Sequence, residues 1–152
     1  MSTPLPPDIV RFLNAQTCAN ICCIAADNTP YCFTCFFYFD EEQSCIYFKS
    51  QMQTHHAALL EQNGRVAGTI LEDTLNTLQL KGVQFQGFAK RNSIFDIAPA
   101  MKYHARYPMA VAIPGEIWTL YFESIKFTDN SQGFGHKTHW SARSQSKDEQ
   151  DA

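Results

Sequence analysis

The sequence has no segment that could cross a membrane and no concentration of positive charge. Its 152 residues contain 12 Lys and Arg against 15 Asp and Glu, which gives a formal net charge of -3. A nucleic-acid-binding face needs clustered cations to neutralise phosphates, so we expect no nucleic-acid partner. No apolar run approaches the roughly 20 residues of a membrane span, and the chain does not begin with a basic segment followed by an apolar one. We therefore expect a cytoplasmic protein without a membrane partner.

Internal repeats, low-complexity segments and signs of a second domain are also absent from the sequence. A chain of this length can bury about two thirds of its unfolded surface in one core. We expect a single domain over residues 1–140, followed by a polar, disordered tail over residues 141–152. The chain is rich in aromatic residues, with 12 Phe and 6 Tyr.

The six cysteines are concentrated in the first third of the chain, and Cys32 and Cys35 form a C-x-x-C motif. Zinc or redox chemistry is one interpretation of that motif. In an extended strand, however, positions three apart face opposite sides of the sheet, and a thioredoxin-like pair begins a helix instead. We therefore expect no metal site and regard the cysteines as reduced, small core residues. They are Cys18, Cys22, Cys23, Cys32, Cys35 and Cys45.

Long runs of β-branched and aromatic residues predict a mainly β fold. Residues 17–50 contain three such runs separated by two polar turns, and further strands are predicted at RVAGTILED (65–73), TLQLKGVQFQGFAKR (77–91) and EIWTLYFESIKFTD (116–129). In the last strand, Trp118, Leu120 and Phe122 share one face. A small antiparallel barrel is favoured because closure removes exposed edges, although a sandwich remains possible.

Three short helices are predicted around these strands. The first has Asp8 as its N-cap, the second runs from an N-cap at Thr54 to Gln62, and the third lies in residues 93–106. Asn63 and Gly64 are expected to end the second helix with a left-handed residue.

The segment KSQMQTHHAALL (49–60) brings a strand end, a hydroxyl and two histidines to the start of a helix. Free backbone N–H groups and the helix dipole make such a place suitable for a phosphate, with Thr54, His55 and His56 as side-chain donors. The alternative is a Thr-capped surface helix with two solvated histidines. A metal site fits poorly because adjacent helical residues point about 100° apart.

Three further segments have candidate binding residues. Gln84 and Gln86 share one face of a strand, which is either a solvent face or a face that hydrogen-bonds a heteroaromatic ring or phosphate. His104 and Arg106 near a helix end either complement the helix dipole or contact a ligand. Residues 125–140, which include His136, form a glycine-bearing aromatic segment typical of a pocket or an interface.

The order PYCFTCFFYF, CIYFKS, THHAALL, RVAGTI, GVQFQG resembles the FMN-binding split barrels related to pyridoxamine 5'-phosphate oxidase, over roughly residues 21–140. GVQFQG, YHARYP and EIWTLYFESIKFTDNSQGFGHK are similar to a family of small bacterial proteins of uncharacterised function. The resemblance implies a six-stranded antiparallel split β-barrel with a few peripheral α-helices, forming a homodimer with the flavin between its subunits.

The resemblance also assigns cofactor residues by position. The oxidase's phosphate motif falls on Thr54, His55 and His56, and the residues just before it fall on Ser50 and Gln51. Lys49, which the same strand brings to the start of the helix, is also expected to bind the cofactor. The strand residues Thr34, Cys35 and Phe36 are expected to present backbone groups to the flavin ring, and Gln84 matches a position that contacts the ring or phosphate.

The oxidase's substrate motif aligns with residues 134–136, where the histidine is kept as His136 and the arginine is replaced by Phe134. The candidate substrate residues are therefore His104, Arg106, His136 and Lys137, for a small molecule that the resemblance does not specify. We expect an FMN-dependent oxidoreductase without pyridoxamine phosphate oxidase activity. The alternatives are a non-catalytic carrier or sensor of flavin or haem, and a barrel that has lost its cofactor and serves as an interaction domain.

Overall fold

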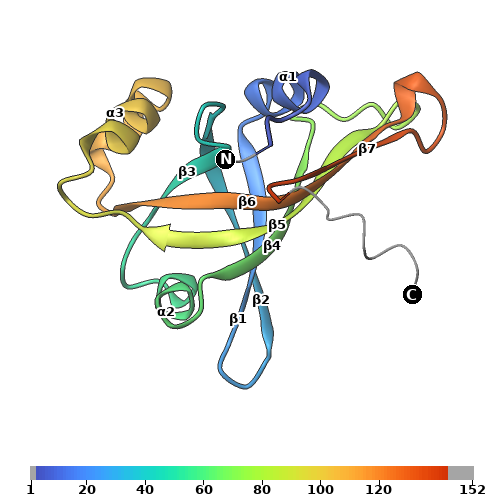
Figure 1. Ribbon diagram of the computed structural model, residues 1–152. Helices are drawn as coiled ribbons and strands as arrows, with labels where there is room; N and C mark the ends of the chain where they lie inside the picture. Colours follow the sequence, from blue (N-terminus) through green and yellow to red (C-terminus); the bar gives the residue numbers. More distant parts are fainter. Residues whose placement is uncertain (1–2, 144–152) are drawn as a thin grey trace.

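The computed structural model describes residues 3–143, which form a β-barrel with three α-helices around it (Figure 1). Residues 144–152 of the expected tail lie outside the described residues. The helices and strands, in order, are α1 (Pro7–Ala15), β1 (Cys18–Ile24), β2 (Pro30–Asp40), β3 (Cys45–Ser50), α2 (His55–Gln62), β4 (Arg65–Leu71), β5 (Lys81–Arg91), α3 (Ile97–Arg106), β6 (Glu116–Asp129) and β7 (Lys137–Ser141), with short 3-10 helices η1 (Pro108–Ala112) and η2 (Asn130–Gln132).

The sheet is antiparallel in the order β3-β2-β1-β4-β5-β6-β7, and an additional pairing of β3 with β6 closes its first six strands into a barrel. The six-stranded barrel predicted from the sequence is confirmed. The seventh strand, β7, was not predicted. It pairs with the far half of β6, beyond the part of β6 that pairs with β3.

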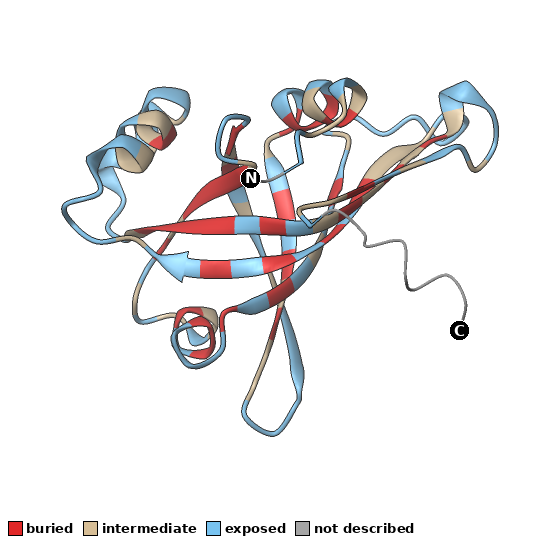
Figure 2. Cartoon of the chain, in the orientation of Figure 1, coloured by how far each residue is buried: buried red, intermediate tan, exposed pale blue. Residues whose placement is uncertain are grey.

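A bulge in β6 decides which side chains fill the barrel. Gln86 is opposite Ser124 and Gly87 is opposite Phe122, so Glu123 is the additional residue. Inward-facing residues are therefore even-numbered up to Phe122 and odd-numbered from Ile125 onward. Figure 2 shows buried and exposed stretches alternating along β6. The predicted shared face of Trp118, Leu120 and Phe122 is confirmed, and all three are buried.

Helix α1 covers one end of the barrel with a buried face made of Ile9, Phe12 and Leu13. The prediction that Asp8 is its N-cap was wrong. The N-cap is Pro6, which has no side chain capable of capping, and Asp8 lies inside the first turn. There its carboxylate accepts hydrogen bonds from its neighbour's backbone N–H and from the Thr138 hydroxyl on β7.

Helix α2 begins at the predicted N-cap, and Thr54 Oγ1 accepts a hydrogen bond from the N–H of Ala57. Its predicted left-handed end was wrong, because Asn63 is extended at φ -147° and neither Asn63 nor Gly64 has a positive φ. Gly64 is required for space instead. A Cβ there would lie 2.5 Å from the carbonyl oxygen of Ala89 and 2.7 Å from the Phe88 ring.

Strand β5 begins later than predicted, at Lys81. Leu78 is 90% exposed in the preceding turn, where the Asn76 side chain accepts a hydrogen bond from its N–H. Local side-chain bonding of this kind competes with strand pairing. Helix α3 also begins later than predicted, at Ile97, but ends at Arg106 as expected.

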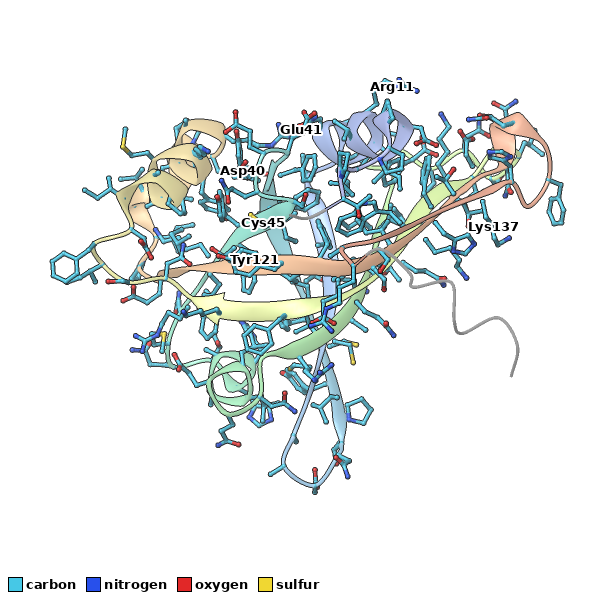
Figure 3. The ribbon with its side chains drawn as sticks, viewed as in Figure 1. Arg11, Asp40, Glu41, Cys45, Tyr121 and Lys137 are labelled. Carbon is cyan, nitrogen blue, oxygen red and sulfur yellow. The ribbon has the colours of Figure 1, made fainter. Side chains whose placement is uncertain are left out.

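Helix α3 lies over the outer side of β3, so that β3 is buried on both faces. Figure 3 shows Asp40, Cys45 and Tyr121 lying near one another, in agreement with their direct pairing across β2, β3 and β6. The Asp40 carboxylate accepts hydrogen bonds from Tyr47 at 2.7 Å and from Lys102 on α3 at 2.8 Å. This buried carboxylate therefore ties the helix to the barrel.

Candidate functional site

The start of α2 forms a compact cluster of polar side chains. The hydroxyls of Ser50 and Thr54 lie 3.4 Å apart, and His56 Nε2 contacts both. Thr54 also donates to the carbonyl of Gln51 at 2.8 Å. The structure therefore brings together Ser50, Thr54 and His56, but their polar atoms largely satisfy one another.

The two adjacent histidines have different environments. His56 is half-buried, and its ring stacks on Phe33 at 3.9 Å between centroids and 8° between planes. Burial, followed by the charge on His55, lowers the pKa of His56, so this imidazole is neutral at pH 7. His55 is exposed and meets Tyr31 edge-on at 4.8 Å. Of the two, His55 is free to reach a ligand together with the backbone N–H groups of the first turn.

Lys49 directly precedes Ser50 in β3, and its ammonium group contacts α3 and the chain that follows α3. Its Nζ lies 3.1 Å from His104 Nε2 and donates to the carbonyl of Ala110 at 2.8 Å. Burial, followed by the Lys49 charge, lowers the pKa of His104, which suits a neutral imidazole accepting from Lys49. Lys49, which was predicted to bind the cofactor, therefore contacts His104, which was predicted to bind the substrate.

A row of polar side chains crosses the outer face of six strands. Thr34 is directly opposite Asn20, Asn20 opposite Thr69, Thr69 opposite Gln84, Gln84 opposite Lys126, and Lys126 opposite His139. We call these six residues the polar row. Antiparallel partners point to the same side of a sheet, so Thr34 and Gln84, predicted from separate segments, face the same side.

All members of the polar row except Thr34 line a cavity of about 1110 Å³, somewhat larger than most small-molecule sites. A second row, made of Cys32, Cys22, Ala67, Gln86, Ser124 and Ser141 in that order across the strands, lies beside the first one and also lines the cavity. Trp140 and the N-terminal residues Thr3, Pro4 and Pro6 also line the cavity. Neither His55 nor His56 lines this cavity.

The remaining predicted site residues are dispersed. Gln51 is exposed, Cys35 is half-buried against the barrel core, and Phe36 is 55% exposed with its ring 5.6 Å from that of Tyr107. Arg106 donates to the carbonyl of Gln16 and to the Tyr107 hydroxyl, so it fixes α3 in place.

His136 and Lys137 lie at the other end of β6 from His104. Lys137 pairs with Thr128 late in β6, whereas Lys49, which contacts His104, pairs with Ile117 near its start. Figure 3 shows Lys137 close to the turn between β6 and β7, far along the ribbon from α3. The four predicted substrate residues therefore do not form one site within this chain.

The sequence interpretation missed four members of the polar row: Asn20, Thr69, Lys126 and His139. Each lies in a strand beside apolar residues, and the only local sign that it faces outward is the alternation of polar and apolar residues along that strand. Their alignment depends on strand register, which becomes visible only in the folded sheet.

Comparison with solved structures defines the class of protein. A haem-binding protein of Mycobacterium smegmatis has a TM-score of 0.74 at 11% identity, with 92% of this chain aligned to 60% of that one. An FAD-binding protein of Mesorhizobium loti has a TM-score of 0.66 at 15% identity over 82% and 95% of the two chains. A Listeria innocua protein named for pyridoxamine 5'-phosphate oxidase has a TM-score of 0.62 at 12% identity over 79% and 94%. At these identities the likeness shows the fold alone, a split barrel of the pyridoxamine 5'-phosphate oxidase type.

Sequence comparison identifies the family within that class. A UPF0306 protein of Photorhabdus laumondii is 33% identical over 133 residues, which cover 87% of this chain and 92% of the relative. A UPF0306 protein of Yersinia pestis is 31% identical over 140 residues, covering 90% and 95%. No family model matches the sequence. The chain belongs to the UPF0306 family, and the resemblance drawn from its motifs is confirmed.

Proposed function

We propose that this chain is the FMN-binding subunit of a homodimeric flavoprotein, a flavin-dependent oxidoreductase acting on a small molecule. The observation that carries the proposal is the polar row, because five of its six members, including Gln84, line a cavity of about 1110 Å³. Bound FMN would supply the hydride chemistry, while the protein supplies orientation and electrostatics.

The polar row has the chemistry to hold a heteroaromatic ring. The Gln84 and Asn20 amides each offer donors and an acceptor, and Thr34 and Thr69 add hydroxyls. Lys126 lies directly opposite Gln84 and is partly buried, so its cation would favour the more negative, reduced form of the ring. These residues fit the ring of a flavin, and all of them except Thr34 line the cavity.

At the start of α2, backbone N–H groups and the helix dipole would contribute more to phosphate binding than permanent positive charge. His55 is exposed beside the first-turn N–H groups, whereas His56 is neutral and bonded inward to Ser50. Hydrogen bonds from neutral donors are weaker than those from an Arg-Lys pair. We therefore expect FMN to be held less tightly here than by a site with two permanent cations.

An exposed apolar patch on and around α3 supports dimerisation. Seven side chains there are 53–85% exposed, and most of the segment is coloured as exposed in Figure 2. A monomer rarely exposes so many neighbouring large apolar groups. A second copy of this chain would cover them. The residues, which we call the α3 patch, are Ile94, Phe95, Ile97, Met101, Met109, Val111 and Ile113.

The test is flavin retention. The purified protein is incubated with FMN and desalted, its visible spectrum is recorded, and any released ligand is identified by mass spectrometry. We expect retained flavin in the wild type, and at least a tenfold weaker affinity, or about 1.4 kcal/mol, in both Gln84→Leu and His55→Ala. Gln79→Leu, in the exposed turn before β5, is the matched control and should bind normally. A wild type that retains no flavin, or equal affinity in all variants, would contradict the proposal.

A second candidate is a non-catalytic carrier of haem or flavin. His139 supports it, since this exposed histidine ends the polar row and lines the cavity, where it could ligate haem iron. Haem titration followed by absorption in the wild type and His139→Ala tests this candidate. A carrier of flavin should show no NAD(P)H oxidation beyond that of free flavin, whereas the oxidoreductase should.

A further inference from the structure

Two cysteines face each other across the β1–β2 hairpin, Cys22 on β1 and Cys32 on β2. Whether they form a hydrogen-bonded or a non-hydrogen-bonded pair follows from the backbone hydrogen bonds at the two ends of the hairpin. The Ala25 N–H donates to the carbonyl of Thr29, and the Phe37 N–H donates to that of Thr17, so both of these are hydrogen-bonded pairs. Hydrogen-bonded and non-hydrogen-bonded pairs alternate along an antiparallel ladder, and counting from either end makes Cys22 and Cys32 a non-hydrogen-bonded pair.

Non-hydrogen-bonded pairs have the separation that a disulfide needs. Their Cα atoms lie about 4.5 Å apart, inside the range of about 4.4–6.8 Å found for disulfides. As directly opposite residues, Cys22 and Cys32 point to the same face of the hairpin, and both line the cavity. The next pair of the same type, Asn20 and Thr34, also has its side chains in contact, with Oδ1 and Oγ1 3.2 Å apart.

The two thiols are accessible from the cavity. Cys32 is exposed, Cys22 is half-buried, and both belong to the second row that lines the cavity. Cys23 and Cys45 are buried instead. The expectation that all the cysteines are core residues was therefore wrong for Cys32 and for Cys18, which is also exposed, because alternate residues of β1 and β2 face outward.

We propose that Cys22 and Cys32 are a redox-active dithiol that reacts with small disulfides of the glutathione class. The Cys32 thiolate attacks one sulfur of the small disulfide, forms a mixed disulfide and releases one thiol. The Cys22 thiol then loses its proton to solvent, and the resulting thiolate attacks the Cys32 sulfur. This closes the cross-strand disulfide and releases the second small thiolate, which takes up a proton. The protein dithiol loses two electrons and two protons, and the small disulfide is reduced to two thiols.

The order of attack follows from the environments of the two sulfurs. Burial, followed by the interaction with Cys32, raises the pKa of the Cys22 thiol. Cys22 is therefore protonated at neutral pH and resolves the mixed disulfide instead of initiating the exchange. This inference does not rest on the proposed flavin site, because it requires only the hairpin and an accessible Cys32; flavin bound in the same cavity would slow the reaction, so the test uses protein without added FMN.

The experiment is oxidation of the full chain with glutathione disulfide, followed by alkylation and peptide mapping without reduction. We expect a Cys22–Cys32 disulfide in the folded wild type, formed faster as the pH rises and reversed by excess reduced glutathione. Cys22→Ser should instead accumulate a stable glutathione adduct on Cys32, and Cys32→Ser should form no cross-link. Cys18 is an internal control, since it is exposed but opposite Phe36, and it should form only a mixed disulfide.

Three outcomes would overturn the proposal: adducts on Cys32 that never resolve in the wild type, a cross-link between Cys32 and a different cysteine, or a Cys22–Cys32 disulfide that forms only after denaturation. The wild-type peptide map is decisive without the variants, so a variant that fails to fold leaves the test intact.

Discussion

The pair His55 and His56 shows how far two adjacent residues of one type can differ. Successive positions at the start of α2 point about 100° apart, so one ring faces solvent and the other packs on Phe33 and contacts Ser50. The sequence interpretation treated them as an equivalent pair of phosphate donors, and the structure gives them separate tasks. His56 stabilises the turn before the helix, and His55 remains available to contact a ligand.

This difference leads to a pH-dependence of stability that belongs to His56. Its folded-state pKa is lowered from 6.5 by burial and by the charge on His55. The stabilisation from neutral His56 is therefore complete above pH 6.5 and is lost as the pH falls through that value toward the lower, folded-state pKa. We expect the wild-type free energy of unfolding, measured in urea from pH 8 to pH 5, to decline more steeply below pH 6.5 than that of His56→Gln.

The matched variant is His55→Gln, which changes the exposed neighbour. It should retain most of the wild-type decline, because only the smaller contribution to the His56 shift comes from His55. Equal slopes in the wild type and His56→Gln would show that His56 titrates alike in the folded and unfolded states.

At the scale of elements, α1 covers the open end of the barrel, and its two faces have different functions. Leu13 is fully buried, and Phe12 packs on Phe127 of β6 with ring centroids 5.0 Å apart. Figure 3 shows Arg11 on the outer side of the same helix. The helix thus stabilises the barrel through one apolar face.

Truncation of that face should be costly. We expect Leu13→Ala to lower the free energy of unfolding by about 2–5 kcal/mol, because it leaves a cavity under the helix. Arg11→Ala removes an exposed side chain two residues before Leu13 in the same helix. It should change the free energy of unfolding by less than about 0.5 kcal/mol. Urea denaturation of both variants measures the difference, and a loss below 1 kcal/mol for Leu13→Ala would mean that α1 is not part of the cooperative core.

At the scale of the whole molecule, two regions of the outer surface bear on function. One outer region has the polar row and its cavity, and another has the α3 patch. None of the helices in residues 3–143 is long and apolar enough to span a membrane. A second copy of the chain is the partner that we propose for the α3 patch.

Dimerisation through the α3 patch can be tested directly. We expect the wild type to sediment as a dimer at micromolar concentration and Phe95→Asp with Met109→Asp to sediment as a folded monomer, because each change buries a charge in an apolar interface. Phe95 and Met109 are 84% and 85% exposed. Leu78→Asp, at an apolar residue that is 90% exposed outside the patch, should leave the dimer intact. A wild type that remains monomeric would contradict the proposal.

The sequence by itself determined the elements whose causes are local. Six strands follow from runs of β-branched and aromatic residues, the N-cap of α2 from a hydroxyl before a helical pattern, and the family from the motifs in residues 82–87, 103–108 and 116–137. These features depend on neighbours along the chain, so the order of residues was sufficient to predict them.

Only the tertiary structure decided which distant residues meet. The bulge at Glu123 reverses the inward and outward faces of β6, and the register of six strands aligns Asn20 with Gln84, Lys126 and His139. The same register sets Cys22 opposite Cys32, and β7 exists because the far half of β6 offers it a free edge. A shift of one residue would send each of these side chains to the other face. Register is fixed by packing of the whole barrel, and for that reason no local pattern could predict the site.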